Sequence, residues 1–537
     1  MKISIRTVSL VLFLGLMNSG LDARGQSKFM QLGFEMDYVY ESWNTGSSLT
    51  IARNKAAIDA SAAAGFKWFR MWVEVWPVGT CSPPYPTFSF DDAQLVQFKT
   101  IYQYALDKGL KVYVFSQPNS CYTQSGISRA DYKRLLAAHF SYLAKKLPGV
   151  SVWQIYNEAN WIHPKTGQFF CPEPVLSSCP LGLPSLPSSY MTELKEDIQI
   201  ARNSIKAVNS LAQITTNVTG SIPFVAQYRS SIRSLLNSYI QTFNPPGSPS
   251  SHLLDVVGFD FYPQLSQLPG FEIEVSYFRS LYGDKFWIAE TGLPSKQGAA
   301  NTAGDQVTYY TKVMPIFARA NVQNIILYHY QDRDSWASGD LAHYGLIDHN
   351  LFKKFGYDKI MATLALFKDF DLALPNRVSR ANAAELLMSS FSEAFGRLPF
   401  GYEVFNAGGW VDYLVSSPQT RAWLVAQHVA WMNTVPAAEE DVLRRAYRNL
   451  LGREPSAYEL QSWMNAVNPS YLNLSGQFTS WLNTAAGVGD RTRIVNDAYQ
   501  TYLLRPPSAA ESSSWVNSYI YSADGLKEQF RFFVDSP

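Results

Sequence analysis

Two glutamates stand at the ends of short apolar runs in this sequence. Glu158 lies in the string WQIYNEAN, and Glu290 lies in the string FWIAETGLPS. Burying a carboxylate at the end of an apolar strand costs free energy unless a partner or a reaction uses it. Two carboxyl groups facing each other over a sugar suit the cleavage of a glycosidic bond, because one protonates the leaving oxygen and the other attacks the sugar or activates water. We therefore predict that Glu158 and Glu290 form a catalytic pair.

Residues 29–370 alternate short apolar runs with longer amphipathic stretches, the pattern of repeated βα units that would position this pair. The early strands are separated by helix-like stretches at Thr50–Ala64, Asp92–Lys108, Arg129–Lys146 and Tyr190–Asn209. The eight candidate strands are Met30–Met36, Trp68–Met71, Lys111–Ser116, Val150–Tyr156, Ala212–Thr216, Val256–Phe261, Phe286–Ala289 and Asn324–Tyr328.

Eight strands with interposed helices favour a (β/α)8 TIM barrel over an open doubly wound sheet, for which the sequence has no GxGxxG or GxxxxGK motif. The fourth and seventh strands of such a barrel lie nearly opposite each other. Both end at its carboxyl-terminal mouth, where barrel enzymes build their active sites. The predicted fold class is therefore α/β, with Glu158 and Glu290 facing each other across the mouth.

The strings NEAN and AETGLPS resemble the acid/base and nucleophile motifs of the retaining (β/α)8 glycosidases, a superfamily that includes cellulases, β-1,3-glucanases, galactanases and xylosidases. The resemblance covers residues 29–370. It implies that Glu158 is the general acid/base, that Glu290 is the nucleophile, and that Asn157 binds the sugar 2-hydroxyl. Retention of configuration would place the two carboxyl groups about 5 to 5.5 Å apart.

Weaker matches extend the resemblance to the walls of the site. Arg70 in FRMW resembles the second-strand arginine that keeps the nucleophile ionised, although a structural ion pair is an equal alternative. Tyr262 in FDFYP resembles the sixth-strand tyrosine that hydrogen-bonds the nucleophile. Two residues before it, Asp260 stands where the superfamily often has histidine.

Sugar stacking requires an aromatic platform, which the superfamily commonly places at the end of the eighth strand as tryptophan. Here that strand ends in YHYQ, so stacking is expected of Tyr330 or of Trp336 in the following loop. Trp161, just beyond NEAN, is a further candidate for substrate contact. For Trp161 and Trp336, packing within a loop is an equal alternative. The segment HYGLID, which ends at Asp348, resembles a turn found before the last barrel helix in several families.

The amino-terminal residues and the charge balance indicate export without a nucleic-acid partner. Residues 1–25 have the basic, apolar and polar regions of a signal peptide. A second segment of membrane-spanning length is missing, so no membrane association is expected after cleavage. The 537-residue chain has 45 Lys and Arg against 44 Asp and Glu, and this net charge of +1 provides no field to attract nucleic acid. The expected location is secreted or extracytoplasmic.

Four cysteines in an exported chain favour disulfides over a metal site. Cys171 and Cys179 bracket a proline-rich loop and are expected to bridge each other, which leaves Cys81 and Cys121 as the second pair. The alternative of a metal centre lacks CxxC spacing and a nearby histidine pair.

After a predicted linker at residues 371–384, residues 385–537 form a smaller all-α domain of three repeats in this interpretation. In each repeat an aromatic residue precedes an arginine by six positions, a proline follows the arginine by two, and a tryptophan comes later. The arginines are Arg397, Arg453 and Arg505, and the tryptophans Trp410, Trp463 and Trp515 are interpreted as core residues rather than ligand contacts. The repeats resemble a helical domain of unknown function at the ends of bacterial exported proteins. They are expected to contact another protein or the cell surface.

The function expected from these features is hydrolysis of a β-linked polysaccharide by double displacement, without a metal or an organic cofactor. A β-glucan, a galactan or a related hemicellulose is the expected substrate, and the residues after AETGLPS look most like those of β-1,3-glucanases. Two alternatives remain open. The barrel could be a carbohydrate-binding pseudoenzyme, or the same carboxylates could transfer the glycosyl group to another sugar.

Overall fold

The structure is a computed structural model that describes residues 28–36, 48–75, 77–78, 88–118, 127–160, 186–219, 229–295, 302–332, 343–348, 352–405, 408–464 and 469–535. The predicted signal peptide, all four cysteines, Trp161 and Trp336 lie outside these residues, so their predictions remain untested. The chain divides into two compact units. One comprises Met30–Pro294 and Ala320–Leu346, and the other comprises Met1–Phe29, Ser295–Arg319 and Ile347–Pro537.

The first unit contains a sheet of nine parallel strands in the order β5-β4-β3-β2-β1-β9-β8-β7-β6. Its edge strands β5 and β6 are separated along the chain only by Thr216, so the sheet closes into a barrel with eight strand positions. The strands are β1 (Gln31–Met36), β2 (Trp68–Trp72), β3 (Lys111–Ser116), β4 (Val150–Ile155), β5 (Gln213–Thr215), β6 (Asn217–Thr219), β7 (Val257–Asp260), β8 (Phe286–Glu290) and β9 (Asn324–Leu327). The predicted TIM barrel followed by an all-α region is therefore confirmed.

One predicted strand needs correction. The sequence placed the fifth strand at Ala212–Thr216, whereas this position of the barrel continues to Thr219. The segment is divided at Thr216: β5 pairs with β4, and β6 pairs with β7. Because this strand position continues beyond Thr216, Asn217 is part of the sheet.

Apolar side chains fill the barrel below its carboxyl-terminal mouth. Trp68, Tyr113 and Trp287 form a core cluster there together with Val152, Val256 and Ile326, and all six are at most 4% exposed. The rings of Trp68 and Trp287 lie 4.8 Å apart between centroids. Large rings packed in this way make the barrel interior a solid support for the site above it.

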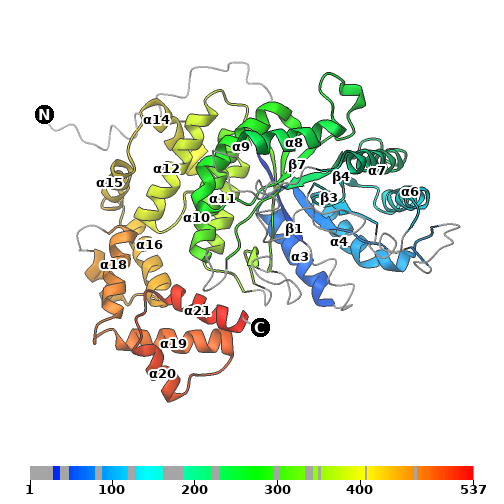
Figure 1. The fold of residues 1–537 in the computed structure, drawn as a ribbon. Coiled ribbons are helices and arrows are strands. Elements are labelled where there is room, and N and C mark those ends of the chain that lie inside the picture. Colours follow the sequence, from blue (N-terminus) through cyan, green and yellow to red (C-terminus); the bar gives the residue numbers. More distant parts are fainter. Residues whose placement is uncertain are drawn as a thin grey trace. The chain divides into compact units, whose positions relative to one another are not determined.

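Helices alternate with the strands, as the sequence predicts (Figure 1). The helix predicted at Asp92–Lys108 begins as a short 3-10 turn over Asp92–Leu95, and the predicted helix at Arg129–Lys146 has those bounds. Gly65 and Gly109, with φ of 76° and 78°, end the first two predicted helices in the left-handed conformation. The helices of this unit are α3 (Ser48–Ala63), α4 (Val96–Asp107), α6 (Arg129–Lys146), α7 (Ser188–Lys206), α8 (Arg229–Phe243) and α9 (Leu268–Tyr282).

The described part of the second unit is largely helical. Its helices include α10 (Ala303–Arg319), α11 (Tyr357–Lys368), α12 (Arg377–Phe395), α13 (Gly401–Phe405), α14 (Trp410–Ser416), α15 (Arg421–Met432), α16 (Pro436–Ala446), α17 (Ala457–Met464), α18 (Tyr471–Leu482), α19 (Val488–Leu503), α20 (Ala509–Val516) and α21 (Ala523–Asp535). The predicted linker at residues 371–384 is wrong from Arg377 onward, where α12 begins. Ala381 and Ala384 are buried in this helix, which packs against α10, so the segment is part of a core.

The same ion pair occurs at the three arginines that the sequence singled out. Each arginine binds, through both of its terminal nitrogens, a glutamate six residues later, and each lies over the ring of the aromatic residue six positions earlier. The pairs are Arg397 with Glu403, Arg453 with Glu459, and Arg505 with Glu511. The division into three repeats stays a prediction.

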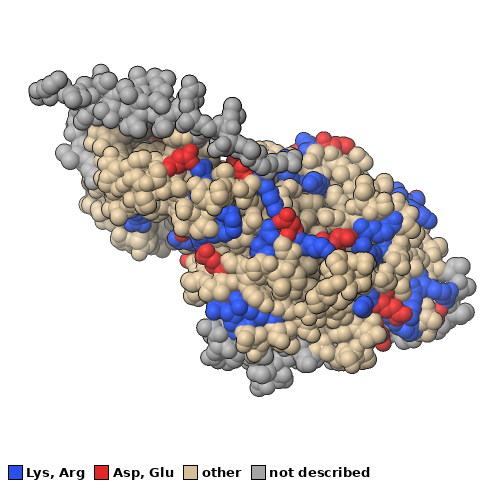
Figure 2. Space-filling model, turned by 90° about the horizontal axis from the view of Figure 1, so that it is seen from above, with Lys and Arg blue, Asp and Glu red and all other residues tan. Residues whose placement is uncertain are grey.

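Charged side chains of both signs are interspersed on the face drawn in Figure 2. Of the helices within the described ranges, none has the length and apolar character needed to cross a bilayer.

Candidate active site

The carboxyl ends of the barrel strands carry a layer of polar side chains. Strand register sets Glu35 on β1 beside Arg70 on β2, and sets Asp260 on β7 beside Glu290 on β8. All four residues are at most 5% exposed. Burying a cation together with carboxyl groups is favourable only when they are paired, and hydrogen bonds from Arg70 to Glu35 and Glu290 provide that pairing.

Arg70 is the cation at the centre of this layer. Its Nη1 donates to Glu35 and also to Glu290 Oε1, at 2.6 Å in the latter case, while its Nη2 donates to Gln154 Oε1 at 2.8 Å. Tyr113 donates to the same Gln154 oxygen at 2.7 Å, and its ring lies 5.2 Å from the guanidinium carbon. The surrounding carboxylates raise the pKa of Arg70 although burial opposes them, so its charge is permanent.

Glu290 is the last residue of β8 and is held at both carboxylate oxygens. Arg70 contacts Oε1, and the Tyr262 hydroxyl donates to Oε2. Asn217 Nδ2 lies 3.5 Å from Oε1. The contact from Tyr262 is present even though Asp260, and not histidine, stands two residues before it. An ion pair and a phenol together stabilise the ionised carboxylate and fix its orientation.

Glu158 follows β4 in a turn of unusual backbone conformation. Tyr156 and Glu158 have φ of 67° and 44°, in the left-handed region that residues with a side chain rarely adopt. The Glu158 amide donates to Asn217 Oδ1 at 2.8 Å, which holds the turn against β6. Backbone conformations of this kind persist only where surrounding contacts hold them in place, and they often occur at functional sites.

The protonation of Glu158 differs from that of an ordinary glutamate. Burial raises its pKa, and the negative charge of Glu290 raises it further, to about 8. A hydrogen bond with Thr219 and the charge of Arg70 oppose this increase only in part. Glu158 therefore carries a proton at neutral pH, beside a partner that Arg70 and Tyr262 hold as an anion.

Asn157 is connected to the same network. Its Oδ1 accepts from Gln154 Nε2 at 3.0 Å and from Asn217 Nδ2 at 2.9 Å. Two donors on the carbonyl oxygen turn the amide nitrogen of Asn157 to the other side of the group. That orientation suits donation to a ligand hydroxyl.

Asp260 is fully buried and accepts a hydrogen bond from Asn217. Within the part of the chain that the structure describes, its Oδ1 has no hydrogen-bond partner. Burial raises the pKa of Asp260 well above its ordinary value, and the charge of Glu290 raises it further. Burial and the neighbouring negative charge therefore favour the protonated form of Asp260 more than they would in an ordinary, exposed aspartate.

Tyr330, one of the two predicted stacking residues, is largely buried, and its contact with a substrate stays a prediction. Tyr330 is only 6% exposed, and its ring lies 5.2 Å from that of Phe34 in an edge-on contact. Tyr328, two residues earlier, instead packs edge-on against Tyr262 at 5.6 Å. The other proposed platforms, Trp161 and Trp336, lie outside the described residues.

Three residues of this network were missed by sequence reasoning. Glu35 lies at the carboxyl-terminal end of an apolar run, near the strand end as Glu158 and Glu290 are, so the same signal could have identified it. Gln154 is a polar residue inside an otherwise apolar strand, which is also a detectable signal. Asn217 has no such mark, because its place depends on the interruption between β5 and β6.

Chemically, the layer pairs a protonated carboxyl with a carboxylate at the mouth of a barrel. No three His, Cys, Asp or Glu side chains gather into a possible metal site in the described ranges. The arrangement can therefore donate a proton at one point and present an anionic oxygen at another.

No family model matches the chain, and no curated protein matches it. Among solved structures, the hyperthermophilic β-glucosidase from Pyrococcus furiosus has a TM-score of 0.46 at 13% identity, over 66% of this chain and 100% of that one. The β-glycosidase BGL167 has a TM-score of 0.46 at 15% identity, over 64% of this chain and 97% of that one. The exo-β-1,4-mannosidase Op5Man5 from Opitutaceae bacterium strain TAV5 has a TM-score of 0.45 at 14% identity, over 69% of this chain and 71% of that one.

Proposed function

We propose that this protein is a glycoside hydrolase that cleaves a β-linked polysaccharide with retention of configuration. The observation that carries the proposal is the unequal environment of two neighbouring carboxyl groups. Arg70 and Tyr262 hold Glu290 as an anion, while burial and the charge of Glu290 keep a proton on Glu158. Double displacement requires these two protonation states before the first step.

In the first step Glu158 gives its proton to the glycosidic oxygen while a Glu290 oxygen attacks the anomeric carbon. The bond from that carbon to the leaving oxygen breaks, and a covalent glycosyl ester forms on Glu290. Esterification removes the charge of Glu290, which is one of the causes of the raised pKa of Glu158. Glu158, having lost its proton, is then better able to remain ionised and to accept a proton from water.

In the second step water attacks the anomeric carbon, Glu158 takes its proton, and Glu290 leaves as the carboxylate. Arg70 and Tyr262 stabilise that carboxylate as it reforms. Asn157 is suited to donate to the sugar 2-hydroxyl, because Gln154 and Asn217 occupy its carbonyl oxygen. We propose a β-glucan, a galactan or a related hemicellulose as the substrate, acted on after export.

Product analysis on a panel of β-glucans, galactans and mannans tests this proposal, with Glu158→Ala and Glu290→Ala as variants. Hydrolysis by the parent chain, with kcat reduced at least about a thousandfold in Glu290→Ala, is expected when a nucleophile is removed. Glu158→Ala should retain activity only on aryl glycosides whose phenolate leaves without a proton. Comparable hydrolysis by the parent and both variants would overturn the proposal.

The same panel separates the two alternatives. A carbohydrate-binding pseudoenzyme would bind one polysaccharide without any turnover, and both alanine variants would bind equally well. A transglycosylase would lengthen oligosaccharides instead of shortening them, with the same dependence on Glu158 and Glu290. Shortened products that carry new reducing ends support the hydrolase.

A further inference from the structure

A cavity of about 700 Å³ lies among the carboxyl-terminal helices. It is lined from the turn of π-helix at Tyr447–Leu451, from α17 and from α18. This volume is within the range of small-molecule sites, roughly 300 to 1,000 Å³. Among the residues that the structure describes, those lining the cavity all belong to the second compact unit, and none of them is part of the carboxylate layer of the barrel.

Two tryptophans contribute to the walls of the cavity, and contacts with the rest of the chain fix their orientation. The indole nitrogen of Trp463 donates to the Tyr447 hydroxyl at 3.0 Å, and its ring lies edge-on to Phe478 at 5.2 Å. The indole nitrogen of Trp481 donates to Asp490 Oδ2 at 3.2 Å, yet 43% of this residue is exposed. Trp463, expected from the sequence to be a core residue, is instead only half-buried and lines a cavity.

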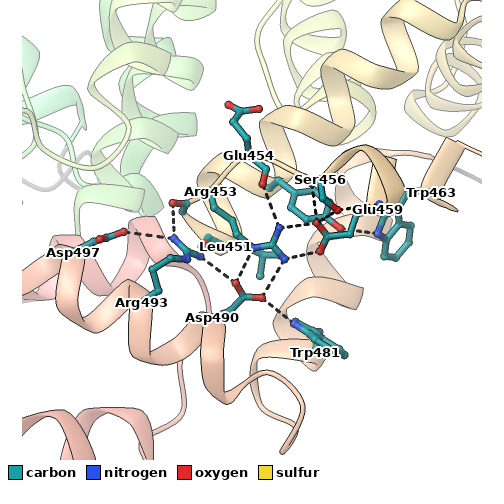
Figure 3. Close-up of polar contacts among 12 residues, drawn as sticks. Leu451, Arg453, Glu454, Ser456, Glu459, Trp463, Trp481, Asp490, Arg493 and Asp497 are labelled. Carbon is teal, nitrogen blue, oxygen red and sulfur yellow. Dashed lines mark hydrogen bonds and ion pairs between the residues drawn. The ribbon is translucent and has the colours of Figure 1, made fainter. Parts of the chain in front are cut away.

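The charged groups beside these rings neutralise one another (Figure 3). Arg453 donates to both oxygens of Glu459, at 2.8 and 2.6 Å, and its Nε donates to Asp490 Oδ1 at 2.8 Å. Arg493 donates to the same Asp490 oxygen at 3.1 Å. Because each cation already binds carboxylates, this part of the wall is rigid and offers little attraction to a charged ligand.

Another part of the wall is one face of α18, which carries Trp481 and uncharged polar groups. Asn473, Gln477 and Ser480 line the cavity at positions that are four and three residues apart, which places them on the same helix face. Gly476 lies between them, and a Cβ atom built on it would meet no heavy atom within 4 Å. A glycine inside a helix costs about 1 kcal/mol relative to alanine, and here it leaves the cavity open.

Indole rings beside amides and a hydroxyl suit a ligand with apolar faces and many hydroxyl groups, and the compensated charges favour a neutral one. We propose that this cavity binds a short stretch of a neutral, β-linked sugar chain and so holds the polysaccharide at a second site. The inference rests on the proposed function, because its ligand is the polymer that the barrel would cleave. An apolar peptide would offer no hydrogen bonds to the polar side chains of α18, and an anion would find Arg453 already bound to carboxylates.

Binding of the full-length chain to insoluble β-glucan, galactan and mannan tests the cavity. All variants carry Glu290→Gln to prevent turnover, and depletion of the protein from solution gives the Kd. Gly476→Phe places a ring in open space within the cavity and should raise the Kd for one of these polymers about tenfold, the effect of losing a stacked ring and its hydrogen bonds. Gly489→Phe is the matched control, since Gly489 also has open space around it and is not a lining residue.

Trp481→Ala provides a second variant that does not depend on filling the cavity, with Trp431→Ala as its control because Trp431 is 51% exposed and is not a lining residue. The proposal holds if both cavity variants lose affinity and both controls keep it. Unchanged affinity in Gly476→Phe and Trp481→Ala, equal losses in the controls, or tighter binding of an apolar peptide than of any polysaccharide would overturn it. Cleavage of short soluble oligosaccharides by the parent chain is measured separately, so failure of the hydrolase proposal is seen independently of this binding result.

Discussion

Glu158 and Glu290 have the same chemical group but different environments. The cation and phenol that contact Glu290 favour its anion, whereas Glu158 is held through its backbone by Asn217 and lies in the field of that anion. The division of roles between acid and nucleophile thus follows from which carboxylate the arginine reaches.

The pH dependence of kcat/KM should report the proton on Glu158. Activity requires the protonated form of Glu158, whose pKa is raised to about 8, so the alkaline limb of the profile should fall as the pH rises through that value. An aryl glycoside whose phenolate needs no proton should show a much weaker decline. A decline near the ordinary pKa of glutamate, several units lower, would contradict this assignment.

Asn217 should be needed to position the catalytic groups. Asn217→Ala removes the acceptor for the Glu158 amide and a donor to Asn157, so kcat should fall about tenfold to a hundredfold through misplacement, and the alkaline decline should move. Asn237→Ala is the matched control, because Asn237 donates to Tyr277 on α9 and contacts no residue of the network. Equal kinetics for the two variants would show that Asn217 has no positioning role.

Sequence reasoning identified the reactive pair but not all of its surroundings. Glu158 and Glu290 were found because each ends an apolar run, and Arg70 and Tyr262 because their strings match a known pattern. The burial of Tyr330 was not foreseen, because a sequence gives no sign of which face of a strand end turns inward. Asn217 was missed because its contacts come from distant strands.

The residues that follow β8 and β9 approach each other closely through their backbones. The Tyr328 amide donates to the Thr291 carbonyl at 2.9 Å, just beyond Glu290. A Cβ atom on Gly292 would lie 2.2 Å from the Tyr328 carbonyl oxygen. The glycine of the AETGLPS string is therefore required by the approach of two backbones, which explains its place in the motif.

Gly292→Ala should destabilise the barrel. Backbone must move to relieve the contact, at a cost of about 1 to 3 kcal/mol, which lowers the midpoint of thermal unfolding. Gly304→Ala is the control, since its Cβ would meet its nearest atom, Thr302 Oγ1, at 3.5 Å in a helix that favours alanine. A midpoint for Gly292→Ala equal to that of Gly304→Ala would be the contrary result.

The order and type of the elements followed from periodicity, whereas their interruptions did not. Nothing in the residues of the fifth strand marks Thr216 as the point where pairing changes from β4 to β7. The supposed linker at residues 371–384 contains polar residues and a proline, yet Ala381 and Ala384 pack inside α12. Small apolar residues give a weak signal, because they are common in both linkers and helices.

A buried ion pair joins two residues that are far apart in the sequence. Arg531 on α21 donates to Asp348 Oδ2 at 3.1 Å, and their side chains are 0% and 1% exposed. They are 183 positions apart. Asp348 ends the string that resembles a barrel turn, and no pattern in the sequence indicates that its partner is near the carboxyl terminus.

Arg531→Met should therefore destabilise the second unit by about 3 to 5 kcal/mol, because it removes the cation that pairs with a buried carboxylate. Arg505→Met is the control, since the Arg505–Glu511 pair is 50% and 34% exposed, so solvent screens it and its loss should have little effect on stability. Urea unfolding followed by tryptophan fluorescence measures both. Similar losses in the two variants would contradict the importance assigned to the buried pair.

The covalent intermediate on Glu290 is the most direct test of the central claim. A 2-deoxy-2-fluoro glycosyl donor with a good leaving group slows both steps and the second one most, so the glycosyl ester accumulates. Mass spectrometry of the intact chain and of its peptides should then find one sugar on the peptide that contains Glu290, and none in Glu290→Gln. A label on another residue, or turnover to the inverted anomer without any label, would contradict the account.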